Sequence, residues 1–253
     1  MATIAIGDIH GNLAALTDVL DQLLQDVVEG DVIVFLGDYV DRGPDAKGCI
    51  DAILAFEDRV PARVVALCGN HEDWMLRTMR DPTRHSWFLG MQPLDTIRSY
   101  SLEAERALRE AAGHVGLQLF IGSCELPYHL FFDAMPASHR AFFKSLLTHY
   151  QSPDCVCVHA GVHPSFPATD PQFHPRDSLV WGVREFPNAY AGTDVVVYGH
   201  RNNAELVADG WPMPRIVGRT VGIDTIAHGV LTAMRFPDRR LYQSARHEGG
   251  VRP

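Results

Sequence analysis

The chain has 253 residues, 46% of them apolar, and a formal net charge of −9 at neutral pH. Its length and apolar content suffice for one large α/β core, and no apolar run approaches the length of a membrane span. That lack of a spanning run argues against a membrane as partner, and the acidic charge argues against nucleic acid as the main partner, because the basic surface that its backbone requires is missing.

Three apolar, β-branched runs stand near the N-terminus, and a helical pattern follows each. The runs cover residues 3–6, 32–36 and 64–67. Continuous apolar runs of this length, separated by helices, are typical of buried parallel strands. Since the carboxyl ends of parallel strands share one edge of a sheet, the segments after these runs should meet there.

Each run ends in a polar, glycine-flanked loop. The loops read Gly-Asp-Ile-His-Gly at 7–11, Gly-Asp-Tyr-Val-Asp-Arg-Gly at 37–43 and Gly-Asn-His-Glu at 69–72. They bring carboxylates, an amide oxygen and imidazoles to one edge, and this donor set suits divalent cations. Because clustered buried carboxylates need a counter-charge, the edge is predicted to bind metal ions.

Residues 81–151 change in character, since prolines and glycines break an aromatic-rich stretch before helical patterns at 101–112 and 137–150. We expect a helical insertion between the two halves of the molecule, beside the metal-binding edge. It either forms a substrate pocket or lid, or is a helical layer that covers the sheet. The layer is the favoured interpretation for most of its residues.

Two later histidines also follow apolar runs. His159 ends the run at 155–158, and His200 ends the run at 195–199. Further short runs at 216–223 and 229–236, bounded by glycine and proline turns, predict a second sheet packed on the first.

The expected fold is therefore α/β, with two packed mixed β-sheets flanked by helices and a helical insertion. We expect one domain over residues 1–243, followed by a flexible polar tail at 244–253.

A site for two metal ions needs one bridging carboxylate and separate ligands for each ion. We assign Asp8, His10 and Asp38 to the first ion, and Asp38, Asn70, His159 and His200 to the second. A water held between ions roughly 3.5–4 Å apart loses a proton near neutral pH. The mixed oxygen and imidazole set favours manganese, with iron or zinc as alternatives.

These motifs, in this order, resemble the metal-dependent phosphoprotein phosphatase family among the calcineurin-like phosphoesterases. They are most similar to its small bacterial and phage-type serine/threonine phosphatases. The resemblance runs from Ile4 to about Arg235 and includes the segments 223–225 and 229–233. It implies an enzyme, a dinuclear-metal phosphoesterase in which the bridging hydroxide attacks phosphorus.

The resemblance also implies roles for residues that are not metal ligands. His71 would be the general acid that protonates the leaving alkoxide, with Asp41 holding its imidazole. Arg42 offers a planar fork that matches phosphate oxygens, and Arg184 stands where the family carries another phosphate-binding arginine.

Three functions remain open at this point. The first is a phosphomonoesterase, foremost a serine/threonine protein phosphatase acting on a phosphorylated protein or peptide. The second is a hydrolase of dinucleoside polyphosphates or another small phosphorylated metabolite, for which the aromatics around Trp87 would be base-stacking candidates. The third, a non-catalytic scaffold, predicts eroded ligands, and none is eroded.

Two residue positions bear on this choice. The related symmetrical dinucleoside tetraphosphatases commonly lack the aspartate at position 41 and read Asn-His-Asp at the third loop. Asp41 and the glutamate of the third loop are both present here, which favours phosphomonoesters. Against this, Cys68 replaces an arginine that precedes the third loop in many of these phosphatases, and Arg201, Arg219 or an arginine of the insertion are candidates to replace it.

The five cysteines form no disulfide framework. An odd number of thiols within strand and helix patterns indicates reduced, buried cysteines. The first strand begins almost at once, without a basic segment followed by an apolar one, so we expect a cytoplasmic protein.

Overall fold

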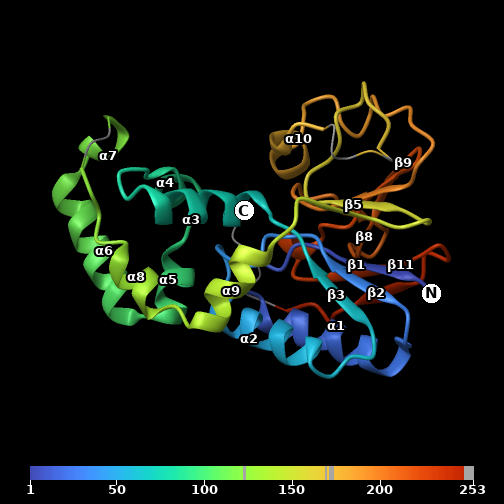
Figure 1. Ribbon diagram of the computed structural model, residues 1–253, viewed down its shortest axis with the longest axis horizontal. Helices are drawn as coiled ribbons and strands as arrows, with labels where there is room; N and C mark the ends of the chain where they lie inside the picture. The colour runs from blue at the N-terminus through green and yellow to red at the C-terminus, as the bar shows by residue number, and fades with distance from the viewer. Residues whose placement is uncertain (122–123, 169, 171–173, 248–253) are drawn as a thin grey trace.

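The structure is a computed structural model that describes residues 1–121, 124–168, 170 and 174–247. Two five-stranded sheets pack face to face, and helices lie outside them (Figure 1). Both sheets contain parallel and antiparallel pairs, so the predicted α/β fold with two packed mixed sheets is confirmed.

The first sheet has the strand order β12-β11-β1-β2-β3. Strands β1, β2 and β3 run parallel, whereas β11 pairs antiparallel with β1, and β12 pairs antiparallel with β11 at the other edge. Its strands are β1 (Thr3–Ile6), β2 (Val32–Phe35), β3 (Arg63–Ala66), β11 (Thr232–Phe236) and β12 (Leu241–Gln243).

The second sheet has the order β4-β5-β6-β10-β9, in which β5, β6 and β10 run parallel. Its strands are β4 (His149–Gln151), β5 (Val156–Val158), β6 (Val196–Tyr198), β9 (Arg215–Val217) and β10 (Thr220–Gly222). A small hairpin of β7 (Glu205–Leu206) and β8 (Pro212–Met213) stands apart from it.

Alternation along the strands explains the layers. Ala5 and Val34 of the first sheet meet Cys157 and Val197 of the second in a core between the sheets. The neighbouring residues on each strand point to the opposite faces, where Ile4, for example, packs in the helical layer. Because both faces of both sheets are covered, the strands read as continuous apolar runs rather than as alternating ones.

Helices α1 (Leu13–Asp26) and α2 (Ala46–Glu57) cover the outer face of the first sheet. The Asn12 side chain caps α1, since its Oδ1 accepts a hydrogen bond from the Ala15 N–H at 3.1 Å. Helix α3 (Asn70–Arg80) leads from the third loop into the insertion.

The insertion contains α4 (Ser86–Gly90), α5 (Leu94–Tyr100), α6 (Leu102–Val115), α7 (Gln118–Ile121), α8 (His129–Ala134) and α9 (Ala137–Ser145). Instead of covering a sheet, most of it extends to one side of both sheets (Figure 1). Its buried residues Trp87, Ile97 and Phe131 belong to the same core cluster as α1 and α2, so it continues their layer sideways.

Two expected elements differ from those observed. The helix expected over 137–150 ends at Ser145, and His149–Gln151 pair with β5 as β4. The strand expected over 216–223 is a hairpin, because Gly218 takes a left-handed φ of 56° and turns the chain between β9 and β10. Helix α10 (Arg176–Trp181) covers the outer face of the second sheet.

The beginning of the expected tail is held against the domain. The buried Ser244 accepts a hydrogen bond from the Leu231 N–H through its Oγ, and His247 Nε2 lies 2.8 Å from the Asp18 carboxylate. Residues 248–253 lie outside the described residues. Within the part that is described, no helix combines the length and apolar character needed to cross a bilayer.

Candidate metal centre

Loops at the carboxyl ends of five parallel strands converge between the two sheets. They follow β1, β2 and β3 of the first sheet and β5 and β6 of the second. Glycines allow this approach: a Cβ at Gly69 would overlap the carboxylate of Asp38, and one at Gly199 would overlap that of Asp8. The site therefore depends on close packing between the loops.

Asp38 lies at the middle of the site, and its side chain is 1% exposed. Its Oδ2 is 3.5 Å from His10 Nε2 and 3.8 Å from His71 Nε2. Its Oδ1, by contrast, is 3.4 Å from His159 Nε2. The two oxygens thus face two separate groups of donors, as a carboxylate that bridges two ions would.

The group on the Oδ1 side is completed by Asn70 and His200. The amide oxygen of Asn70 lies 3.0 Å from His159 Nε2 and 2.8 Å from His200 Nδ1. Potential ligand atoms of Asp38, His159 and His200 all lie within 4.8 Å of one another. The four residues assigned to the second ion are therefore together in the structure.

The group on the Oδ2 side is less simple. Potential ligand atoms of His10, Asp38 and His71 lie within 4.8 Å of one another, and Asp8 is outside this set. Asp8 Oδ2 accepts a hydrogen bond from the His200 N–H at 2.9 Å, and its buried Oδ1 has no partner among the described residues. By geometry alone His71 thus belongs to this group, although the motifs indicate a general acid and not a ligand at this position.

The pKa values of the four imidazoles are shifted in different directions, because their surroundings differ. Burial lowers the pKa of His10 and His159, and it lowers the pKa of His200 to about 3. Burial acts in the same direction on His71, but the carboxylates of Asp38 and Asp41 outweigh it and raise its pKa. His71 is therefore the imidazole of the four whose surroundings favour the protonated form.

The ring nitrogens that face away from the centre are fixed by backbone carbonyls. His10 Nδ1 donates to the Val40 carbonyl at 3.0 Å, and His159 Nδ1 donates to the Leu36 carbonyl at 2.9 Å. Each bond sets the tautomer and turns the lone pair of Nε2 toward Asp38. This is the arrangement that a metal-ligating histidine requires.

Among the described residues, the positive charge of Arg42 is too small to offset the burial and mutual repulsion of Asp8 and Asp224. Burial, then the neighbouring charges of Asp224 and Asp38, raise the pKa of Asp8. Burial and Asp38 likewise raise the pKa of Asp224 to about 7, and one oxygen of this buried residue has no partner among the described residues. Divalent cations would supply the missing charge, so the donor set fits two metal ions.

Asp41 holds His71 from the side of the insertion. Its Oδ2 lies 2.8 Å from His71 Nδ1 and accepts a hydrogen bond from Trp87 Nε1 at 2.9 Å, while its backbone N–H donates to Thr96 Oγ1. Trp87 is fully buried, so it cannot stack on a base. No motif in residues 81–151 indicates that the insertion supplies these two hydrogen bonds.

Glu72 is a second residue whose structural role the sequence does not indicate. It reads as an ordinary acidic residue at a helix start, yet it is fully buried. Its Oε2 accepts from the backbone N–H groups of Asp38 and Gly69, and its Oε1 accepts from Tyr39, with Val40 at 3.3 Å. Glu72 thus ties the second loop to the third.

The two predicted phosphate-binding arginines differ in position. Arg42 is half-buried, and its Nη1 lies 3.2 Å from His10 Nε2 at the edge of the centre. Arg184 is exposed after α10, and no hydrogen bond or ion pair joins it to the centre within the residues described. Arg42 therefore lies at the metal-binding edge, and the phosphate-binding role expected of Arg184 stays a prediction.

A different arginine lies beside Cys68. Arg176, at the start of α10, places its Nη2 3.7 Å from Cys68 Sγ, and its Nη1 forms an ion pair with Asp73 at 2.7 Å. Neither Arg201 nor Arg219 makes this contact: Arg201 is exposed, and Arg219 lines a hollow at the far end of the second sheet. No motif around position 176 marks it.

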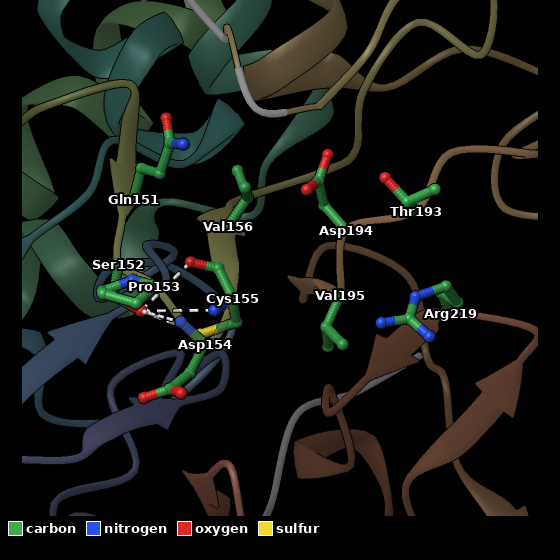
Figure 2. Close-up of a pocket in the computed structure, with 10 residues that line it drawn as sticks. All are labelled: Gln151, Ser152, Pro153, Asp154, Cys155, Val156, Thr193, Asp194, Val195 and Arg219. Carbon is green, nitrogen blue, oxygen red and sulfur yellow. Dashed lines mark hydrogen bonds between the residues drawn. The ribbon is translucent and has the colours of Figure 1, made fainter.

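Several hollows open among the described residues, and two of them bear on the position of the site. One of about 430 Å³ opens beside Arg42, between the second loop and the insertion. The other, of about 280 Å³, includes Asp154 and Arg219 in its wall (Figure 2). It is formed by residues that precede β5 and β6, whereas His159 and His200 follow these strands, so it lies at the opposite end of the sheet from the metal centre.

Residues 1–229 match the family model of calcineurin-like phosphoesterases. The asymmetrical bis(5'-nucleosyl)-tetraphosphatase PrpE of Geobacillus thermodenitrificans is 29% identical, over 92% of this chain and 89% of its own. The enzyme of the same name from Anoxybacillus flavithermus is 26% identical over the same shares. A crystal structure described provisionally as that of a diadenosine tetraphosphatase has a TM-score of 0.63 and 19% identity, and the match covers 98% of this chain and 95% of that one.

Proposed function

The chain belongs to the calcineurin-like phosphoesterase family and is a metal-dependent phosphoesterase, and from this premise we propose that it hydrolyses dinucleoside polyphosphates. The observation that carries the proposal is the similarity to asymmetrical tetraphosphatases along 92% of the chain. The pocket beside Arg42 supports it, because a polyphosphate substrate extends well beyond the phosphorus that reacts. The motifs of the sequence favour phosphomonoesters first and this substrate class second.

The proposed ligands are those of the sequence analysis, two sets that share Asp38. We keep Asp8 rather than His71 in the first set, because Asp8 has an unpartnered buried oxygen and a need for counter-charge. Bound there, two divalent ions would polarise phosphoryl oxygens and lower the pKa of a bound water. Manganese remains the proposed metal, with iron or zinc as alternatives.

Residues outside the two ligand sets bind the phosphoryl oxygens and donate a proton to the leaving group. Arg42 binds the oxygens of the reacting phosphoryl group with its planar guanidinium. His71 carries the proton that the leaving group takes, and Asp41 keeps the proton on the imidazole and orients the ring. Trp87 in turn fixes Asp41, which makes the tryptophan a positioning residue.

A second candidate substrate is a phosphomonoester, including the phosphoserine or phosphothreonine of a protein. The His71–Asp41 pair at 2.8 Å favours it. An alkoxide leaving group is strongly basic and needs a proton, whereas a phosphate leaving group needs one less.

The deciding experiment compares diadenosine tetraphosphate with a phosphoserine peptide as substrates of the manganese-loaded protein. We expect the dinucleotide to be cleaved with the higher kcat/KM. The products locate the cut, since cleavage at the centre of the tetraphosphate gives two diphosphates and an off-centre cut gives a mono- and a triphosphate. Faster hydrolysis of the peptide would refute the proposal in favour of the second candidate.

A further inference from the structure

The pocket of about 430 Å³ beside Arg42 is open to a ligand and is unusually rich in arginine. Its wall contains Arg42, Arg98 and Arg109, together with Phe88 and Asp95. These residues come from the second metal-site loop and from α4, α5 and α6 of the insertion. The pocket is therefore built where the insertion meets the metal centre.

The two arginines of the insertion are held in place by one buried carboxylate. Glu105, 6% exposed, has its Oε1 2.5 Å from Arg109 Nη2 and 3.3 Å from Arg98 Nη2. Arg98 Nη1 also lies 2.8 Å from Asp95 Oδ1. Three guanidinium groups thus face two carboxylates, which leaves one net positive charge and several N–H donors for a ligand, because each guanidinium has five.

Arg42 connects the pocket with the metal centre. Its side chain contacts His10, and its backbone N–H donates to the carbonyl of Gln92, a pocket residue, at 3.4 Å. Gln92 has a φ of 55°, a left-handed value shared by Asp38 and Arg42 in the centre itself. Such costly backbone persists where surrounding contacts enforce it, and it concentrates at functional sites.

Phe88 supplies the aromatic surface of the pocket. It is half-buried, and its ring meets that of Tyr128 edge to face, with centroids 6.4 Å apart. The neighbouring Trp87 is fully buried and serves Asp41. Of these two aromatic residues of α4, Phe88 is the one that a ligand in the pocket can reach.

Building on the proposed function, we propose that this pocket binds the part of a dinucleoside polyphosphate that lies beyond the scissile phosphorus. Arg98 and Arg109 bind the distal phosphates, and Phe88 stacks on the nucleobase. Glu105 is a positioning residue that orients both guanidinium groups. A simple phosphomonoester has no distal phosphates, so the pocket selects polyphosphates over monoesters.

The test compares diadenosine tetraphosphate with an aryl phosphate, which has no distal part. Arg109→Gln should lower kcat/KM for the dinucleotide about tenfold more than for the aryl phosphate, as expected for the loss of a charge-assisted hydrogen bond. Arg106→Gln is the matched control, because Arg106 is exposed on the same helix and does not line the pocket. Arg106→Gln should leave kcat/KM unchanged for both substrates. An equal effect of Arg109→Gln on both substrates would overturn the proposal.

A second measurement does not require dinucleotide cleavage. ATP and inorganic triphosphate are used as inhibitors of aryl phosphate hydrolysis at fixed free metal concentration. Arg109→Gln should weaken both inhibitors about tenfold, whereas Phe88→Leu should weaken ATP alone. If the wild type fails to cleave the dinucleotide but shows these dependences, the pocket stands and the proposed substrate falls. If the wild type cleaves it and both variants are inhibited as the wild type is, the pocket proposal falls and the function stands.

Discussion

At the scale of single residues, the charge around each buried imidazole decides what it can do. His10 and His159 each donate one ring N–H to a backbone carbonyl, and burial lowers their pKa values. They stay neutral, as a metal ligand must. His71 lies between the carboxylates of Asp38 and Asp41, which raise its pKa. The same side chain thus serves two kinds of chemistry within one cluster.

Replacing His71 tests this division. His71→Asn should leave the metal content unchanged but lower kcat for an alkyl phosphate by about 10²–10⁴, the usual contribution of a general acid. Aryl phosphates should be slowed far less, because their leaving groups need no proton. Metal analysis and the two rates are measured on the same preparation. Equal losses on both substrates would remove the general-acid assignment, and loss of metal would make His71 a ligand.

Replacing Asp38, unlike replacing His71, should remove the bound metal. Asp38→Asn keeps the shape of the side chain but removes the charge of the one carboxylate that faces both donor groups. We expect metal content and activity to fall together for every substrate. The same change at the exposed Asp58 is the control. An Asp38→Asn protein that still bound two equivalents of metal would rule out the bridging role.

At the scale of elements, the sequence predicts those site residues that stand next to a recognisable strand pattern. Asp8, Asp38 and Asn70 each follow an apolar run directly, so the sequence itself indicates their place at a strand end. Glu72 and Trp87 act through partners distant in the chain, and their own surroundings look like an ordinary helix start and an aromatic core. Contacts of that kind exist only after packing, and no local pattern encodes them.

Glu72 gives a prediction at this scale, because it joins the loop after β2 to the start of α3. In Glu72→Gln the amide nitrogen would face backbone N–H groups and leave them without an acceptor. We expect the free energy of unfolding to fall by roughly 3 kcal/mol, and Tm to fall by about 6–12 °C. Thermal unfolding checks this, with the exposed Glu57→Gln as the control. A Tm equal to that of the wild type would show that the loops hold without this clamp.

At the scale of the whole molecule, the insertion shares its core with the sheet domain. Trp87, Ile97 and Phe131 belong to one cluster with Ile4 and Leu16. We therefore propose that residues 1–243 form a single domain and expect the metal-free protein to unfold in one cooperative transition. Calorimetry compares the calorimetric with the van't Hoff enthalpy. Two resolved transitions would mean that the insertion is a separate unit.

Metal removal tests how the two sheets are joined. The proposed ligands come from both of them, since Asn70 follows β3 of the first sheet, whereas His159 and His200 follow β5 and β6 of the second. Bound ions would link the sheets at this edge. Each ion present at about 100 times its dissociation constant contributes about 2.7 kcal/mol, so removing both should cost about 5 kcal/mol, or roughly 10–20 °C in Tm.

The stability lost on metal removal should be confined to the metal-binding edge. Amide exchange should accelerate in the loops after β5 and β6 more than in α1 and α2, because the apolar core beneath those helices contains no proposed ligand. Manganese added back should restore both Tm and exchange protection. If exchange rose uniformly, or if Tm did not change, the ions would contribute chemistry at this edge without holding the sheets together.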